Sequence, residues 1–436
     1  MTKKCILILL DGIGDRSYDM FHNQTPLQAA HTPHLDRIAA RSATGMYHAS
    51  CIGQALPSET AHFIMFGYDL DQFPGRGALE ALGAGIALEP SDVAVLSHFI
   101  SVRESDNCLF LEENKPSATP EEIQALAEEI QMFTSNGLSI RFTPTGGIRG
   151  IITIKGAASR FITDSDPFAN QKPLVDIQPW NDFKNDAPTI NTAKALKEYL
   201  IHAFRVLAGH PVNNIRQQNQ AVPLNGLNTQ RAGQLRPRKS FRDRYGLSGL
   251  IMASGLVYQG LGDYLGFAVM PVKDTGNPGK DIAERIKTAH SLLDTHDFIH
   301  IHTKTPDEAA HTKDPRLKMN VIESLDAGIG EAIQPLLDDP QILTVITADH
   351  STPSSGPLIH SGESVPLLFS GTGVRHDTVQ RFNEVDVSSG ALGTIRGKEL
   401  ILLILNHLDR AKLQGIMDTP LDQPYWPGIY QPLTLK

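Results

Sequence analysis

The stretch CILILL (residues 5–10) is apolar throughout and is followed directly by the polar sequence DGIGD. An unbroken apolar run of this kind is typical of a strand that is buried on both faces, as in a parallel sheet covered by helices. Similar runs recur at residues 249–254, 297–303, 343–348 and 365–370. Helical patterns separate them, at residues 280–293 and 317–337. Strands that alternate with helices predict an α/β fold with a mostly parallel sheet.

The middle of the chain has a different pattern. Short, turn-rich alternating segments such as SHFISV and GIRGIITIKG lie between about residues 90 and 180. A longer amphipathic stretch at 189–207 and a polar stretch rich in Asn and Gln follow them. Segments of this kind are typical of an α+β domain. We therefore predict a second domain over residues 88–230, inserted between two parts of the first domain, residues 1–87 and 231–436.

Composition limits the class of protein. The chain has 436 residues, which suits two domains, and a formal net charge of −9, which argues against an electrostatic nucleic-acid binder. Three cysteines form neither a disulfide framework nor a zinc ribbon. No stretch approaches the ~20 apolar residues of a membrane span. We expect a soluble, cytoplasmic protein without a nucleic-acid or membrane partner; no pattern in the chain specifies an oligomeric state.

Ser58 raises the question of function. In CIGQALPSETAHFIMFGYD (51–69) it lies between Pro57 and Glu59, just ahead of an apolar run. Proline cannot continue a helix backwards, and the residues after it are typical of a helix start. Ser58 is therefore either a helix cap or a nucleophile at the positive end of a helix dipole. His62, one turn further on, is interpreted as a packed helix residue.

Carboxylates and imidazoles follow three of the predicted strands. Asp11 comes directly after the first strand, and Asp349 and His350 follow the strand at 343–348. In an open α/β sheet, ligands bind beyond the carboxyl ends of the strands. We therefore expect these side chains at one edge of the sheet.

The third strand, at 297–303, leads into HTKTPDEAAH, where Asp307 and His311 share a helix face because they are four residues apart. His360 follows a Gly/Pro/Ser loop that returns it toward His350. Taken singly, these fragments have structural explanations, since Asp-Gly is typical of turns and DEAAH of exposed helix starts. Together they provide oxygen and nitrogen ligands for two divalent ions such as Mn²⁺ or Zn²⁺. Such ions lower the pKa of a bound hydroxyl, which favours Ser58 as a nucleophile that attacks phosphorus.

The chain resembles the archaeal-type (also bacterial) cofactor-independent phosphoglycerate mutases of the alkaline phosphatase superfamily. The resemblance rests on motifs that fall in the family's order: LDGIGDR, TPLQAAHTPHLDRIA, PSETAHFIMFGYD, FPGRGALEALGAGI, HTKTPDEAAH and ADHSTP…HSGESVPLL. It implies an alkaline-phosphatase-like sheet between helices, with an inserted α+β domain. It also implies interconversion of 3-phosphoglycerate and 2-phosphoglycerate through a phosphoserine, while the inserted domain holds and reorients the glycerate.

By this resemblance Ser58 carries the phosphoryl group at a two-metal site. One metal is expected to be bound by Asp11, Ser58, Asp349 and His350. The other is expected to be bound by Asp307, His311 and His360. Mn²⁺ is the expected ion, with Zn²⁺, Co²⁺ or Mg²⁺ as alternatives.

Four further residues are expected to act on the substrate, a small phosphorylated hydroxy acid. Arg149 in GGIRG and Arg231 in NTQRAG lie where the family places arginines, whose planar forks suit carboxylate and phosphate. Asp166 in ITDSDPF is a candidate acid/base, and Lys304 is placed to neutralise phosphate charge. Arg76 in PGRG is interpreted as structural, at the turn into the insertion.

The departures from the family lie in the insertion. AVLSH (94–98) stands where the family reads AFRCN, so that Leu96 replaces an arginine. SDPF stands for TDPH, so that Phe168 replaces a histidine. Three alternatives therefore stay open beside a mutase: a related phosphotransferase resembling homoserine kinase, a metal-dependent phosphatase, and a non-catalytic metal-binding protein. The kinase alternative lacks a visible P-loop or kinase glycine loop.

Overall fold

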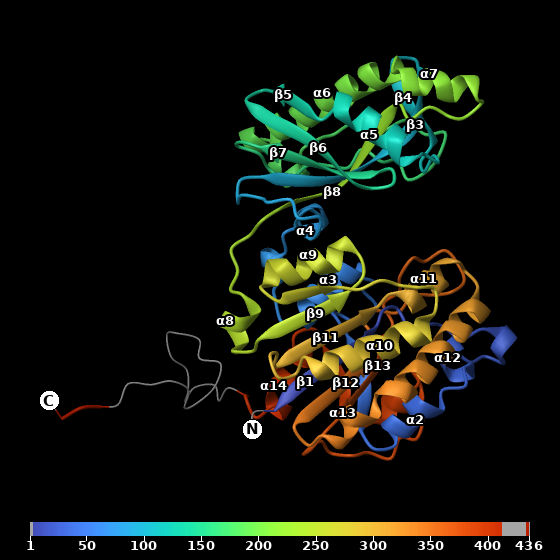
Figure 1. Ribbon diagram of the computed structural model, residues 1–436, viewed down its shortest axis with the longest axis vertical. Coiled ribbons are helices and arrows are strands. Elements are labelled where there is room, and N and C mark those ends of the chain that lie inside the picture. Colours follow the sequence, from blue (N-terminus) through green and yellow to red (C-terminus); the bar gives the residue numbers. More distant parts are fainter. Residues whose placement is uncertain (1–2, 412–432, 436) are drawn as a thin grey trace. The chain divides into compact units, whose positions relative to one another are not determined.

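The computed structural model describes residues 3–411 and 433–435. The chain forms two compact units, which are Met1–Phe73 with Arg238–Lys436, and Pro74–Pro237 (Figure 1). We call the first the catalytic unit and the second the inserted unit. The sequence places the borders at 87/88 and 230/231 instead. Residues 1–2, 412–432 and 436 of the predicted first domain lie outside the described residues.

The catalytic unit is built on an eight-stranded sheet in the order β10-β9-β11-β1-β12-β13-β2-β14. Its strands are β1 (Lys4–Leu10), β2 (Ala43–His48), β9 (Gly249–Ala253), β10 (Ala268–Pro271), β11 (Phe298–Thr303), β12 (Ile342–Thr347), β13 (Val365–Ser370) and β14 (Gly393–Arg396). β13 runs antiparallel to both of its neighbours, and the other pairs in this sheet are parallel. The predicted mostly parallel sheet is confirmed, with its five predicted strands.

Helices cover both faces of this sheet. They are α1 (Pro26–Ala29), α2 (Pro33–Ala39), α3 (Ser58–Met65), α8 (Phe241–Tyr245), α9 (Leu256–Leu265), α10 (Pro278–Ser291), α11 (Thr305–His311), α12 (Pro315–Ala332), α13 (Gln334–Asp338) and α14 (Glu399–His407). α10 and α12 pack together on one face (Figure 1). On the other face, the rings of His62 and Phe66, from α3 and its C-terminus, contact His300 of β11. The central strand β1 is therefore buried on both sides, as its apolar sequence predicts.

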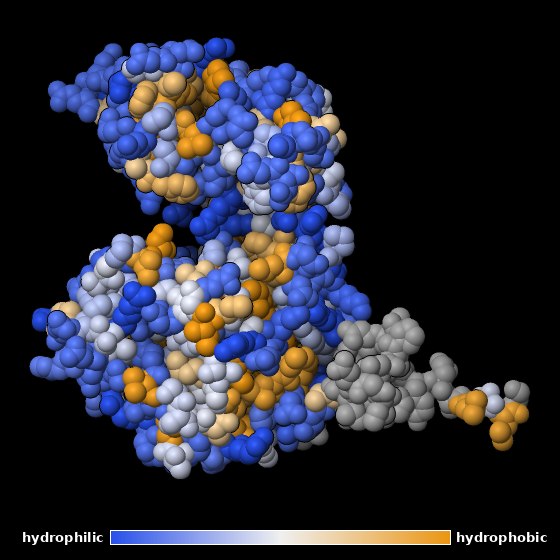
Figure 2. Space-filling view, turned by 180° about the vertical axis from the view of Figure 1, so that it is seen from behind, coloured by the Kyte–Doolittle hydropathy of each residue, from blue (hydrophilic) through white to orange (hydrophobic). Residues whose placement is uncertain are grey.

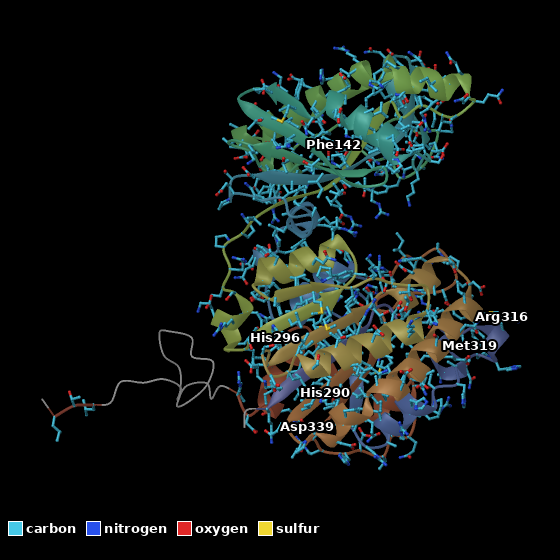
Figure 3. All side chains as sticks on the ribbon, in the orientation of Figure 1. Phe142, His290, His296, Arg316, Met319 and Asp339 are labelled. Carbon is cyan, nitrogen blue, oxygen red and sulfur yellow. The ribbon has the colours of Figure 1, made fainter. Side chains whose placement is uncertain are left out.

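The inserted unit contains a six-stranded antiparallel sheet in the order β4-β3-β7-β6-β5, with β8 paired to β3. Its elements are α4 (Arg76–Gly83), β3 (Val93–Ser105), β4 (Cys108–Glu113), α5 (Pro120–Glu129), β5 (Met132–Ser135), β6 (Leu138–Gly146), β7 (Arg149–Lys155), α6 (Ala187–Ala208), α7 (Pro211–Gln218) and β8 (Gly226–Gln234). α5 and α6 pack on one face, over a core that includes Phe142 (labelled in Figure 3) and Phe99. This is the α+β architecture that the sequence predicts.

The helix α4 explains why the inserted unit extends beyond the borders expected from the sequence. Ala81 of α4 packs against Ala94 and Ile151, on the sheet face opposite α5 and α6. A Cβ at Gly77 would lie only 2.1 Å from the backbone O of Ala94, so glycine permits the close approach. At the other border, β8 continues to Gln234, whose backbone N donates to the carbonyl of Pro74. Both borders therefore move outward.

The surface shown in Figure 2 is mostly hydrophilic on each unit, with scattered apolar residues. Such scattered apolar residues are normal for a folded protein surface. Within the described ranges, no helix has both the length and the apolar character that a membrane crossing requires.

Candidate active site

Three loops of the catalytic unit begin at the same edge of its sheet. β1 lies between β11 and β12, and all three run parallel, so their carboxyl ends are adjacent. Asp11 directly follows β1, Asp349 lies just beyond β12, and α11 with Asp307 begins just after β11. The topology therefore gathers these carboxylates where ligands bind in open α/β sheets.

The carboxylates form two groups with imidazoles. Ligand atoms of Asp11, Asp349 and His350 lie within 4.8 Å of one another, and so do those of Asp307, His350 and His360. His350 thus belongs to both groups, whereas the sequence assigns it to the first alone. His311 Nε2 lies 3.2 Å from Asp307 Oδ2. The seventh expected ligand, Ser58, has its Oγ 2.8 Å from His350 Nε2.

Ser58 is the first residue of α3, and its hydroxyl is not used for capping. Pro57 occupies the N-cap position in an extended conformation, and no side chain caps this helix end. The Ser58 hydroxyl is therefore free to point at His350. His62 Nδ1 lies 2.8 Å from the carbonyl of Ser58 and 3.4 Å from Asp349 Oδ2. The interpretation of His62 as a packed helix residue is therefore incomplete, since its ring also contacts the carboxylate cluster.

The donor set fits a divalent cation. Asp11 Oδ1 and Asp349 Oδ2 are buried and have no hydrogen-bond partner among the described residues. A buried unpaired carboxylate oxygen is costly unless an ion or a donor satisfies it. The other oxygen of Asp11, Oδ2, accepts hydrogen bonds from Tyr258 Oη at 2.8 Å and His302 Nε2 at 2.9 Å. These two donors leave Oδ1 available to a metal, the usual arrangement around ligating carboxylates.

The electrostatics of the cluster push the pKa values of its groups apart. Burial and the nearby Asp349 raise the pKa of Asp11 well above its usual range. Burial acts the same way on Asp349, but His350 and His62 together outweigh it and hold the pKa of Asp349 low. Burial lowers the pKa of His350 to about 4. The imidazole is therefore neutral near pH 7, which is the state that binds metals. Divergent pKa values of this kind are typical of functional sites.

Thr352 connects the two groups. Its Oγ1 donates to Asp307 Oδ1 at 2.8 Å and lies 3.1 Å from His350 Nδ1. Because the hydroxyl proton goes to the carboxylate, we assign the His350 proton to Nδ1, which leaves the Nε2 lone pair facing Ser58. His360 is oriented similarly, since its Nδ1 donates to the carbonyl of Leu56 at 2.7 Å. Sequence reasoning noticed Ser-Thr-Pro after Asp349-His350 but gave Thr352 no role.

A fully buried lysine joins two of the ligand-bearing loops. Lys318 Nζ donates to the carbonyls of Gly14 and Thr352, both at 2.8 Å, and lies 3.1 Å from Asp15 Oδ2. Asp15 in turn accepts hydrogen bonds from the backbone N and Oγ of Ser354. The loop after β1 and the loop after β12 are thereby fixed to α12. The sequence signal was a lysine in phase with the apolar positions of α12, and sequence reasoning missed it.

Lys304 immediately precedes α11. It is half-buried and forms no side-chain hydrogen bond or ion pair with the described residues. Its charge nevertheless acts on Asp11, whose pKa it lowers against the larger effect of burial. An uncommitted ammonium near the carboxylate cluster suits a phosphate ligand.

The remaining expected residues belong to the inserted unit. Arg149 is the exposed first residue of β7. Arg231 lies on β8 with φ of 53°, and its backbone N donates to Asp164. Asp166 is buried and accepts hydrogen bonds from the backbone N of Phe168 and from side-chain amides of β8.

The two departures from the family pattern have different surroundings. Leu96 is partly buried and packs against α4, so it does not replace the polar function of an arginine. Phe168 is 72% exposed and has φ of 58°, a conformation that costs energy for a bulky residue. Arg76 Nε donates a hydrogen bond to Glu80 Oε1 at 2.6 Å, within α4.

Comparisons with known proteins identify the family. A relative from Methanocaldococcus jannaschii, 2,3-bisphosphoglycerate-independent phosphoglycerate mutase 2, is 38% identical over 421 residues, which cover 95% of each chain. The chain belongs to the 2,3-bisphosphoglycerate-independent phosphoglycerate mutase family. The mutase of Thermococcus kodakarensis is 32% identical over 95% of this chain and 99% of its own. The family model described as 2,3-bisphosphoglycerate-independent phosphoglycerate mutase matches residues 39–213.

Solved structures agree with this family. A Pyrococcus horikoshii protein has a TM-score of 0.78 at 28% identity, covering 95% of this chain and all of that one. The cofactor-independent phosphoglycerate mutase of Thermoplasma acidophilum has a TM-score of 0.66 at 28% identity, covering 93% and 99%. The family and the fold class expected from the sequence are both confirmed.

Proposed function

We propose that this chain interconverts 3-phosphoglycerate and 2-phosphoglycerate through a phosphoserine at Ser58. The observation that carries the proposal is the position of the Ser58 hydroxyl, which lies 2.8 Å from His350 Nε2 at the edge of two carboxylate–imidazole groups. Its role as nucleophile, rather than cap, is supported by Pro57, which already occupies the N-cap position.

We assign two divalent cations to this site, with Mn²⁺ as the expected ion. One would be held by Asp11, Ser58, Asp349 and His350, and the other by Asp307, His311 and His360. Bound there, the ions would acidify the serine hydroxyl and offset the charge of the phosphoryl group. The mixed oxygen and nitrogen donors suit Mn²⁺, Zn²⁺ or Co²⁺ more than a thiolate-selective metal.

The reaction consists of two phosphoryl transfers. Ser58 Oγ loses its proton and bonds to phosphorus, while the bond from phosphorus to one glycerate oxygen breaks and that oxygen gains a proton. The neighbouring hydroxyl of the same glycerate then loses its proton, bonds to phosphorus and releases Ser58. The N-terminus of α3 favours the negative phosphoryl group on Ser58 through its dipole. The positive charge of Lys304 is also assigned to stabilising the negative charge of the phosphoryl group.

The inserted unit retains the glycerate between the two transfers. Arg149 and Arg231 are assigned to its carboxylate, because a guanidinium binds carboxylates through two parallel hydrogen bonds. Asp166 is assigned to proton transfer with its hydroxyls. If the glycerate escaped, water would take the phosphoryl group and the enzyme would act as a phosphatase. This second function is considered because Leu96 and Phe168 replace an arginine and a histidine of the family pattern.

The test is to incubate the Mn²⁺-loaded protein with 3-phosphoglycerate and to measure both 2-phosphoglycerate and free phosphate. The proposal expects 2-phosphoglycerate without phosphate, and it expects Ser58→Ala to abolish turnover. Ser388→Ala, which changes an exposed serine on another element, is the matched control and should retain activity. Phosphate alone would identify a hydrolase instead, and substantial turnover by Ser58→Ala would exclude the phosphoserine mechanism.

A further inference from the structure

A row of polar side chains crosses one face of the sheet in the inserted unit. Arg149 of β7 pairs directly with His98 of β3, and His98 pairs directly with Asn228 of β8. Residues directly opposite each other on antiparallel strands point to the same face of the sheet. Asp166 extends the row, since its Oδ2 accepts a hydrogen bond from Asn228 Nδ2 at 2.8 Å. We call these four residues the polar row.

The two ends of the polar row carry opposite charges. Arg149 is exposed, and its guanidinium has no hydrogen-bond or ion-pair partner among the described residues. Asp166 is 2% exposed, and its carboxylate accepts N–H donors from Phe168, Asn228 and Gln230. Bonds from three neutral donors hold this carboxylate in place. One end therefore offers a free cation, and the other an oriented acceptor.

His98 lies between these ends and has one uncommitted nitrogen. Its Nε2 lies 2.9 Å from both the backbone O and Oδ1 of Asn114. Asn228 Nδ2 is 3.2 Å away, but its two protons go to Asn114 Oδ1 and Asp166 Oδ2, so the ring proton of His98 is assigned to Nε2. Nδ1 is then an acceptor, and no described residue bonds to it. The ring is half-buried. Leu96, on the same face two residues earlier, packs against α4, so His98 is the polar side chain that β3 contributes to this row.

A purely structural role for His98 accounts for only part of these contacts. The bond to Asn114 ties β3 to the segment after β4, but it uses Nε2 alone. It leaves Nδ1 and the neighbouring guanidinium of Arg149 without partners. Directly paired residues on antiparallel strands have Cα atoms about 4.5–5.5 Å apart. The two side chains therefore leave the same face of the sheet as direct neighbours, so that one small molecule can contact both.

We propose that His98 contacts the substrate and determines its recognition by the inserted unit. Nδ1 binds a hydroxyl of the glycerate while Arg149 binds its carboxylate. The inference rests on the proposed function and adds to it a residue that compensates for the polar groups absent at Leu96 and Phe168. It assigns the inserted unit to small hydroxy acids, because an acceptor beside a guanidinium matches a hydroxyl beside a carboxylate.

Two conservative variants separate the nitrogens of His98. His98→Gln places an amide near the Nε2 position and retains the tie to Asn114, but it removes Nδ1. His98→Asn places an amide near the Nδ1 position and loses the tie. Binding of 3-phosphoglycerate is measured by calorimetry in the Mn²⁺-loaded Ser58→Ala protein, where turnover cannot interfere. His202→Gln, whose ring stacks on Phe133 elsewhere in the same unit, is the matched control.

The expected result is a Kd about tenfold higher for His98→Gln, the loss of one hydrogen bond, and a Kd within about threefold for His98→Asn and His202→Gln. An unchanged Kd for His98→Gln would overturn the inference. So would weaker binding by His98→Asn with normal binding by His98→Gln, because that pattern belongs to the structural tie. Failure of the proposed function is separate, since it appears as wild-type protein that forms no 2-phosphoglycerate.

Discussion

At the scale of single residues, the site depends on which atom of each side chain is left free. Pro57 takes the N-cap position, so the Ser58 hydroxyl is not consumed by α3. Tyr258 and His302 occupy one oxygen of Asp11 and leave the other without a partner. Pro57 is adjacent to Ser58 in the sequence, whereas Tyr258 and His302 are distant from Asp11, which explains why the sequence indicated Ser58 and Asp11 but not Tyr258 or His302.

Thr352 should matter for activity although it is not an expected ligand. Thr352→Val keeps the shape of the side chain but removes the hydroxyl that links Asp307 to His350. Loss of a group that orients metal ligands typically costs about 10–100-fold in metal affinity or activity. We expect that loss in a titration of mutase activity against Mn²⁺. Thr347→Val, at a buried threonine that bonds to the carbonyl of Pro366, is the control and should behave as wild type. Equal Mn²⁺ dependence of both variants would contradict the role of Thr352.

The buried histidines predict how stability depends on pH. Burial holds the pKa values of His300 and His302 well below their usual range and lowers that of His350 to about 4. Below about pH 6.5 the unfolded chain protonates these rings and the folded chain does not, so the free energy of unfolding should fall as the pH drops from about 6.5 toward 4. Groups with a raised pKa, such as Asp11 and Glu384, oppose this loss, because the folded chain holds their protons at a higher pH than the unfolded chain does.

Urea denaturation of the metal-free protein at several pH values tests this expectation. His300 has no partner for either ring nitrogen among the described residues. His300→Leu should therefore reduce the loss of stability in acid by up to about 1.4 kcal/mol per pH unit. His296→Leu is the control, because His296 is only partly buried and its Nδ1 lies 2.9 Å from Thr295 Oγ1. A pH dependence that is identical in wild type and His300→Leu would show that His300 is not buried in its neutral form.

At the scale of secondary-structure elements, the sequence predicts the strands of the catalytic unit. It does not predict the contact by which Lys318 joins the loops after β1 and β12. Apolar runs such as residues 5–10 can only be buried, so β1 and its parallel neighbours were predictable. The order of those strands, and hence which loops meet, depends on tertiary pairing. α12 is amphipathic, but the burial of Lys318 in its apolar stripe needs Asp15 and two carbonyls from other elements. No local pattern encodes those partners.

Lys318→Met should destabilise the protein, because it leaves Asp15 buried without its cation. Removing one partner of a buried ion pair costs about 3–5 kcal/mol. Lys318→Met combined with Asp15→Asn should recover part of that loss, since the uncompensated charge is gone. Chemical denaturation measures both variants. A double variant no more stable than Lys318→Met alone would contradict the ion-pair explanation.

At the scale of the whole molecule, two domains could be predicted because the turn-rich middle of the chain differs in pattern from the alternating strands and helices on either side of it. The structure places both borders further out, because α4 packs against β3 and β8 of the inserted unit. The site residues divide between the units, with the expected metal ligands in one and Arg149, Asp166 and Arg231 in the other. Only the pairing of strands reveals that Arg149 and His98 are neighbours.

The borders can be tested with two fragments of the inserted unit. Residues 74–237 include α4 and all of β8 and should unfold cooperatively on heating. Residues 88–230 lack α4 and expose the apolar face around Ala94 and Ile151. This fragment should be less stable by about 2 kcal/mol, because it lacks Ala81 and Ile86, which pack in the cluster on that face. Equal thermal stability of the two fragments would instead support the borders expected from the sequence, at 87/88 and 230/231.

Mass spectrometry of the peptide that contains Ser58 tests the phosphoserine intermediate directly. The Mn²⁺-loaded protein is mixed with 3-phosphoglycerate, quenched in acid during turnover and digested. We expect a phosphoryl group on Ser58 that is absent without substrate. Turnover to 2-phosphoglycerate with no phosphoryl group on Ser58 at any quench time, or with the group on another residue, would contradict it.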